Sequence, residues 1–252
     1  MLDQPGKNII FKAENALTGK IFYFFGAIHT NNPADEQFEQ LEQLWNDFLN
    51  KSEGLMIAFV EGAIYEIPQN YEKSITQYGE TGAVCWLALK TNIEVVRPEP
   101  GEGEQRKHLS GLFDSNDVAY AIITQNLSGW FRHETSTSFE EAMERVLKRE
   151  AKFSDIYGFI PNKIWLENQH RKLFEEQELE DRNFLDTITD PRKNDTLINK
   201  IVSARSEMRD EHIFNEIEKA WKSGKNIFIV YGKGHLSKLE KKLKVLISGN
   251  EI

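Results

Sequence analysis

Three residues at the ends of apolar segments could do chemistry together. His29 follows IFYFFGAI and His235 follows IFIVYGKG, each three residues after a glycine, Gly26 and Gly232. A third apolar segment, LMIAFV, runs directly into Glu61. Two imidazoles and one carboxylate form a workable ligand set for a divalent metal ion that keeps open positions for water and substrate. Such an ion lowers the pKa of water and polarises a carbonyl group.

Each of these residues also has an ordinary structural explanation. A histidine after a strand often serves as a turn or cap residue, and a glutamate there is often simply solvated. The repeated strand–Gly-x-x-His unit, together with a third strand that ends in a carboxylate, is better support for a site than any one residue. Ligands of open α/β sheets bind beyond the carboxyl ends of the strands. We therefore expect His29, Glu61 and His235 to converge.

The helix before the last apolar segment carries further candidates. Arg205, Arg209 and His212 stand at i, i+4 and i+7 and so share one helix face. Two interpretations remain open for this face. It could be a charged flank that forms salt bridges with Glu211 or Glu216. Alternatively, Arg209 points toward the strand ends, where it would bind a carboxylate or stabilise an oxyanion.

The segments that position these residues alternate between strands and helices, which predicts the α/β class. We expect a mixed sheet and one domain over residues 1–252, with a helical insertion or cap at roughly 114–190. The expected strands are a hairpin of 8–14 and 20–25 and further strands at 55–60, 92–98 and 226–232. A helix is expected at 33–51, with Pro33 in its first turn, and another at 70–90, broken near Gly79 or Gly82. Further helices are expected between 114 and 223, followed by a basic terminal helix after the last strand.

Composition excludes several classes of function. The 252 residues include 31 basic and 40 acidic side chains, and a net charge of −9 argues against a nucleic-acid-binding surface as the main function. The single cysteine, Cys85, precludes an intramolecular disulfide framework. No apolar stretch approaches the ~18–20 residues of a membrane span. With no export signal at the N-terminus, we expect a cytoplasmic protein that does not bind membranes.

At four places in order, over nearly the whole chain, the sequence resembles the TraB/GumN/Tiki superfamily, which is related to the erythromycin-esterase and ChaN-like proteins. The matching places are FFGAIHT with His29, AFVEG with Glu61, the pair Arg209-Asp210, and IFIVYGKGHL with His235. The chain departs from the family pattern because Asp210 stands where many relatives have Asn, and because the lysine-rich SKLEKKLK that follows His235 lacks the usual glycine.

The resemblance implies an α/β fold of two related halves, each of which contributes one Gly-x-x-His. For the Tiki branch it also implies a divalent-metal-dependent protease, whereas other branches bind pheromone peptides, bind haem or open macrolide esters. Our preferred hypothesis is a metal-dependent hydrolase that acts on an amide or ester, in particular a peptide bond. His29 and His235 would hold Mn²⁺, Co²⁺ or Zn²⁺, with Glu61 as a third ligand or as the general base.

Three further residues have expected roles in this hypothesis. Arg209 would bind substrate or stabilise the oxyanion, Asp210 would orient a histidine, and Glu99 in RPEP would line the same cleft. Two alternatives remain open. One is a metal-independent esterase in which His29 is the general base, and the other is a peptide- or haem-binding protein without turnover.

Overall fold

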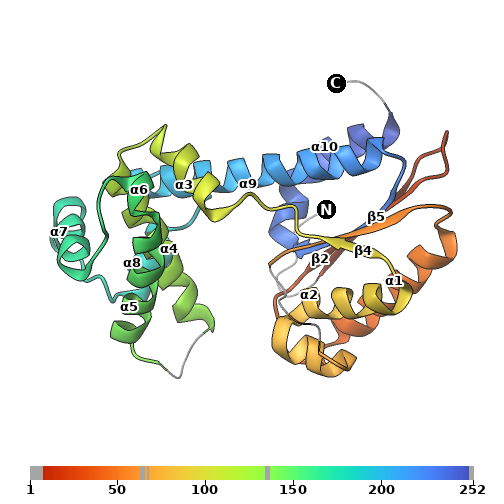
Figure 1. Ribbon diagram of the computed structural model, residues 1–252, viewed down its shortest axis with the longest axis horizontal. Helices are drawn as coiled ribbons and strands as arrows, with labels where there is room; N and C mark the ends of the chain where they lie inside the picture. Colours follow the sequence, from red (N-terminus) through yellow and green to blue (C-terminus); the bar gives the residue numbers. More distant parts are fainter. Residues whose placement is uncertain (1–7, 63–65, 67, 134–136, 250–252) are drawn as a thin grey trace. The chain divides into compact units, whose positions relative to one another are not determined.

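The computed structural model describes residues 8–62, 66, 68–133 and 137–249. Within them, strands form one mixed sheet in the order β1-β2-β5-β3-β4, which confirms the α/β class (Figure 1). β1 is antiparallel to β2, and the other neighbouring pairs are parallel. The strands are β1 (Ile9–Glu14), β2 (Ile21–Ala27), β3 (Met56–Val60), β4 (Glu94–Val96) and β5 (Asn226–Gly232).

The chain divides into two compact units. Unit 1 consists of Met1–Glu99 and Asp210–Ile252, and unit 2 consists of Pro100–Arg209, which includes the expected insertion at about 114–190. The helices are α1 (Glu36–Lys51), α2 (Tyr71–Thr91), α3 (Glu102–Ser110), α4 (Ser115–His133), α5 (Phe139–Glu150), the 3₁₀ turn η1 (Ala151–Phe153), α6 (Ser154–Tyr157), α7 (Lys163–Leu173), α8 (Arg182–Ile188), α9 (Leu197–Lys222) and α10 (Lys233–Ser248). α9 contributes residues to both units.

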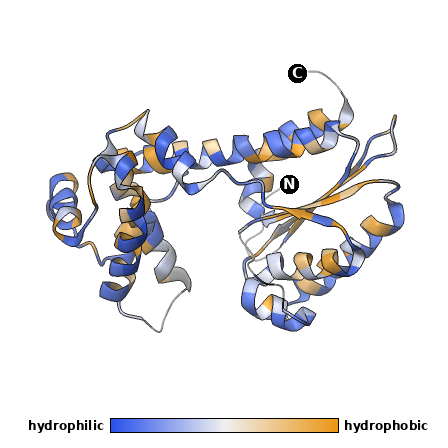
Figure 2. Cartoon of the chain, in the orientation of Figure 1, coloured by the Kyte–Doolittle hydropathy of each residue, from blue (hydrophilic) through white to orange (hydrophobic). Residues whose placement is uncertain are grey.

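The sheet of unit 1 is covered on both faces. Every residue of β2 and β5 is buried, as expected for central strands packed on two sides. The strands of the sheet carry much of the hydrophobic colouring of unit 1 in Figure 2. Alternate residues point to opposite faces. Tyr23 and Phe25 pack with α1 and α2, whereas Phe22 and Phe24 pack with α10 and the second part of α9. The sheet is therefore a rigid support for whatever follows its strand ends.

Two expected element boundaries are wrong for local chemical reasons. Pro33 lies outside the helix, because α1 begins at Glu36 and the Asp35 side chain caps it by accepting a hydrogen bond from the Gln37 amide. The strand expected at 92–98 is limited to β4, since Pro98 has no N–H with which to continue a sheet ladder. The expected hairpin of 8–14 and 20–25 is confirmed by the β1–β2 pairing.

The break expected near Gly79 is confirmed and bends α2. Gly79 has φ 58° and ψ −141°, a conformation that other residues adopt only with strain. A Cβ atom there would also lie 2.9 Å from the carbonyl oxygen of Thr30, so the glycine permits α2 to approach the segment after β2. The kink sets the direction of the next residue, Glu80, which belongs to the candidate site.

Unit 2 is helical and has its own hydrophobic core. α4 lies at its centre, where Val118, Tyr120 and Ile122 pack against α5, α7, α8 and the first part of α9. Tyr120 and the buried His170 share a hydrogen bond of 2.6 Å. Within the described residues, we find no helix with the length and apolar character that a membrane span requires.

Candidate functional site

The sheet topology brings the three predicted strand ends together. β5 lies between β2 and β3, and all three run parallel, so their carboxyl ends share one edge. His29 follows β2, Glu61 follows β3, and His235 follows β5. Nε2 of His29 lies 3.8 Å from Oε2 of Glu61, and Nε2 of His235 lies 3.6 Å from Oε1. We call His29, Glu61 and His235 the strand-end cluster.

Each histidine of the cluster is oriented by a second carboxylate. Nδ1 of His29 donates to the buried Glu80 of α2. Nδ1 of His235 donates to Oδ1 of Asp210 at 2.7 Å, while Nζ of Lys238 lies 3.1 Å from the other oxygen of Asp210. With both Nδ1 atoms engaged in this way, each ring directs its Nε2 atom at Glu61.

Glu61 is fixed by contacts from two neighbouring elements. Its Oε2 atom accepts a hydrogen bond of 2.9 Å from the Gly232 amide at the end of β5. Its backbone amide donates to the carbonyl of Val230 at 3.2 Å, and its carbonyl accepts from Oγ1 of Thr81 at 2.6 Å. The carboxylate is therefore held at the junction of β3, β5 and α2.

The two Gly-x-x-His units differ in local structure. β2 continues through Gly26 to Ala27, so His29 stands in the loop that follows the strand. Gly232 is instead the N-cap of α10, and His235 lies in the first turn of that helix rather than in a turn or loop. The side chain of His29 is 54% exposed, against 15% for His235. A ligand would therefore reach the cluster from the side of His29.

Protonation in the cluster follows from these contacts. The hydrogen bond to Glu80 raises the pKa of His29, and burial opposes this shift. Burial disfavours the charged form of His235, but the carboxylates of Asp210 and Glu61 outweigh it and raise its pKa to about 9. Burial would raise the pKa of Glu61, yet His235, the Gly232 amide and His29 lower it to about 2. Positive charge on both imidazoles is thus stabilised next to an ionised Glu61.

The cluster suits a divalent metal ion by its donor chemistry. Metal-binding imidazoles typically donate their second N–H to a carboxylate, as His29 does to Glu80 and His235 does to Asp210. A third donor, Glu61, lies between the two Nε2 atoms. Among the residues that the structure describes, no three His, Cys, Asp or Glu side chains are grouped closely enough to hold a metal ion as they stand. The fit is therefore one of donor type and orientation.

Gly232 leaves space between these donors. A Cβ atom at this position would lie 2.7 Å from Nε2 of His29 and 3.3 Å from Oε2 of Glu61. The glycine has φ −51°, which any residue adopts, so the requirement for it comes from the site and not from the backbone. Only a residue without a side chain keeps this part of the cluster open.

We expect Gly232→Ala to weaken divalent-metal binding about tenfold or more, because the added methyl group displaces His29. The fold should tolerate it, so the thermal unfolding midpoint should remain close to that of the wild type. Gly234→Ala is the matched control, since no atom lies within 4 Å of the Cβ it would add. Equal metal affinity in both variants would show that the space next to Gly232 has no role in binding.

No protein-family model, curated protein or solved structure matches the chain. The TraB/GumN/Tiki resemblance stays a prediction.

Asp210, Arg209 and Glu99 are the other predicted site residues. Asp210 contacts the cluster through His235. Arg209 belongs to unit 2, so its predicted role toward the cluster stays a prediction. Glu99 lies in unit 1, where its side chain is only 6% exposed and Nη2 of Arg97 is 3.9 Å away. The predicted role of Glu99 in substrate binding also remains untested.

The sequence interpretation missed Glu80, Thr81 and Lys238. Glu80 is the most informative omission, because its carboxylate is buried and holds His29. The stretch GETGAVCWLAL places this acid between two glycines at the start of an apolar helical segment. A carboxylate in such a setting needs a partner when it is buried. This signal could have identified Glu80.

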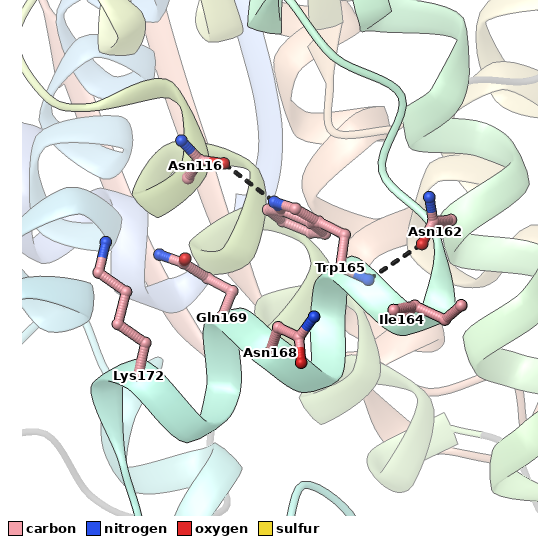
Figure 3. Close-up of a pocket in the computed structure, with 7 residues that line it drawn as sticks. All are labelled: Asn116, Asn162, Ile164, Trp165, Asn168, Gln169 and Lys172. Atoms are coloured by element: carbon pink, nitrogen blue, oxygen red, sulfur yellow. Dashed lines mark hydrogen bonds between the residues drawn. The ribbon is translucent and has the colours of Figure 1, made fainter.

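The hollow shown in Figure 3 is separate from the cluster. It has a volume of about 440 Å³ and lies in unit 2, where α7 and the start of α4 meet. Trp165 donates its indole N–H to Asn116 across it. Its lining has no carboxylate, histidine or cysteine and consists of Asn116, Asn162, Ile164, Trp165, Asn168, Gln169 and Lys172. The hollow therefore offers amide groups for hydrogen bonds and one ammonium group, that of Lys172.

Proposed function

We propose that the chain is a metal-dependent hydrolase of amide bonds, with a peptide as its substrate. The observation that carries the proposal is the paired orientation of the two histidines. His29 and His235 each donate Nδ1 to a carboxylate and direct Nε2 toward opposite oxygens of Glu61. Histidines that bind a metal ion typically donate their second ring N–H to a carboxylate in this way. The two Gly-x-x-His units would then be the contributions of two related halves.

The residues have separable roles in this proposal. His29 and His235 hold a divalent ion, for which Mn²⁺, Co²⁺ and Zn²⁺ are the candidates, and Glu61 is a further ligand or the general base. Such an ion supplies Lewis acidity toward a carbonyl oxygen and makes water more acidic. Metal binding requires both imidazoles to be neutral, and Glu80 and Asp210 would then keep the remaining proton of each ring on Nδ1. Arg209 remains the proposed binder of a substrate carboxylate or of a developing oxyanion.

The proposal is tested by metal analysis and chelation of the full chain. We expect the purified protein to bind about one equivalent of Mn²⁺, Co²⁺ or Zn²⁺ in a calorimetric titration after dialysis against a chelator. Hydrolysis of a mixed peptide library, followed by mass spectrometry, should disappear on chelation and return with one of these ions. Failure to bind any of the three ions would refute the metal site, whatever activity is found.

A second candidate function rests on His29 and Glu80. A histidine whose Nδ1 donates to a buried carboxylate is also the arrangement of a general base, and the side chain of His29 is exposed to a ligand. In a metal-independent esterase, hydrolysis of an ester would survive exhaustive chelation but be lost in His29→Ala. Under the metal proposal, chelation and His29→Ala abolish the same activity.

A further inference from the structure

The hollow of Figure 3 offers a place for a ligand in unit 2, apart from the strand-end cluster. Its volume of about 440 Å³ lies within the range of about 300–1,000 Å³ that is usual for small-molecule pockets. Ile164, Asn168 and Lys172 stand at i, i+4 and i+8 on α7, with Trp165 and Gln169 beside them. One face of α7 therefore forms most of the wall. Because α7 packs against α4 in the core of unit 2, this wall is part of a packed structure.

The carboxamide of Gln169 is held in one orientation. Its Nε2 atom donates to Oδ1 of Asp117 at 2.7 Å. Because an ionised carboxylate only accepts hydrogen bonds, the nitrogen of Gln169 must face Asp117, and Oε1 turns the other way. Gln169 is only 6% exposed and lines the hollow, and its Oε1 atom is neither bonded to a described residue nor shut off from solvent. The deep part of the hollow therefore presents a fixed hydrogen-bond acceptor.

The available donors of the hollow lie nearer its rim. Asn168 and Lys172 are exposed, and they supply an amide NH₂ and an ammonium group. The ionised oxygens of a carboxylate or phosphate ligand only accept hydrogen bonds, so they would face the lone pairs of Gln169. Lys172 also interacts electrostatically with Asp114 and Asp117, which offsets its attraction for an anion. The hollow thus favours an uncharged ligand that both donates and accepts.

Trp165 and Ile164 add apolar surface next to these polar groups. The indole N–H of Trp165 is engaged, because it donates to Oδ1 of Asn116 at 2.9 Å. The ring of Phe159 lies 5.0 Å away, centre to centre, and supports the indole. Ile164 is 73% exposed. A sugar ring suits such a surface, because its C–H groups pack on an aromatic side chain while its hydroxyl groups both donate and accept hydrogen bonds.

We propose that the hollow between α7 and the start of α4 binds an uncharged saccharide. Gln169 accepts a hydrogen bond from one hydroxyl group, Asn168 and Lys172 donate to others, and Trp165 and Ile164 contact the C–H groups of the ring. A cavity that binds benzene measures about 150 Å³, so the hollow has room for a sugar ring with its substituents. The site lies within unit 2 and does not depend on the metal-dependent function proposed for the strand-end cluster.

The test is a nuclear magnetic resonance titration of the ¹⁵N-labelled full chain in buffer with a chelator. The probes are glucose, galactose, mannose and N-acetylglucosamine, and N-acetylglycine methylamide serves as a peptide-like reference. The chain has five tryptophans, and the indole signal of Trp165 is identified by its loss in Trp165→Phe. We expect at least one sugar to shift this signal saturably, together with side-chain amide signals. Saturation separates binding from the general stabilising effect of sugars as cosolvents.

Variants of the wall identify the groups that bind the sugar. Gln169→Leu should weaken binding about tenfold, because it removes the deep acceptor, and Asn168→Ala should weaken it severalfold. Asn168→Ala changes an exposed side chain, so it remains informative if Gln169→Leu does not fold. Asn183→Ala is the matched control, since it removes another exposed helical asparagine of unit 2 that does not line the hollow.

Three results would overturn the proposal. The first is that none of the four sugars shifts the Trp165 signal saturably. The second is that both wall variants bind the sugar as Asn183→Ala does. The third is that only the peptide-like reference binds at Trp165, in which case the ligand is a peptide and not a saccharide.

Discussion

His235→Ala and His29→Ala should each weaken Zn²⁺, Mn²⁺ or Co²⁺ binding by at least about 100-fold, because loss of a ligand exceeds the 10–100-fold effect of outer-shell partners. Glu80→Gln should fall within that smaller range, since the amide still contacts Nδ1 of His29 but no longer carries the charge that raises its basicity. The measurement is calorimetric titration of the dialysed protein. The order of effects, histidine before Glu80, separates ligands from the residues that orient them.

The control for these variants is His108→Ala, which removes an exposed histidine of unit 2. It should bind metal as the wild type does, and it corrects for nonspecific binding to surface imidazoles. Circular dichroism and thermal unfolding should show that all variants keep the fold. If His29→Ala binds metal normally while His235→Ala does not, the paired arrangement has no role and the strand-end cluster is not one site.

The convergence of His29, Glu61 and His235 could be predicted because it depends on topology. Buried parallel strands are recognisable as continuous apolar runs, and their carboxyl ends must share an edge of the sheet. The position of β5 between β2 and β3 could not be derived from the sequence. This position places both histidines next to Glu61. Asp210 was predicted to orient a histidine, and it contacts His235.

Other parts of the site depend on contacts that no local pattern specifies. Glu80 acts on His29 from 51 residues away, and only the kink at Gly79 aims it there. The basic terminal helix was expected at LSKLEKKLK, after His235, but α10 begins at Lys233, immediately after the strand. The apolar spacing of LSKLEKKLKVLI allows the helix to begin early, because Leu236 and Leu239 already pack beneath the sheet.

A buried ion pair in unit 2 is another contact that no local sequence pattern specifies. Its loss is expected to have a large effect on stability. Arg106 and Glu150 are both fully buried. Nε of Arg106 donates to Oε2 of Glu150 at 2.8 Å, its Nη1 atom donates to the carbonyl of Glu102, and the hydroxyl of Tyr157 donates to Glu150 at 2.8 Å. The guanidinium also lies 3.9 Å from the ring centre of Phe153. Glu150 therefore has its hydrogen bonds satisfied only while Arg106 is present.

Arg106→Met should lower the free energy of unfolding of unit 2 by about 3–5 kcal/mol, because it leaves the charge of Glu150 buried without a cation. The double variant Arg106→Met/Glu150→Leu should recover much of this loss, since a well-packed apolar pair often replaces a buried ion pair without cost. Urea unfolding followed by tryptophan fluorescence measures both.

The matched control is the exposed pair of Lys163 and Glu140, for which Lys163→Met should change stability by at most about 1 kcal/mol. Both single variants remove one positive charge from unit 2, so their difference isolates the effect of burial. A loss in Arg106→Met no larger than that in Lys163→Met would mean that the buried Glu150 does not depend on Arg106 in the folded state.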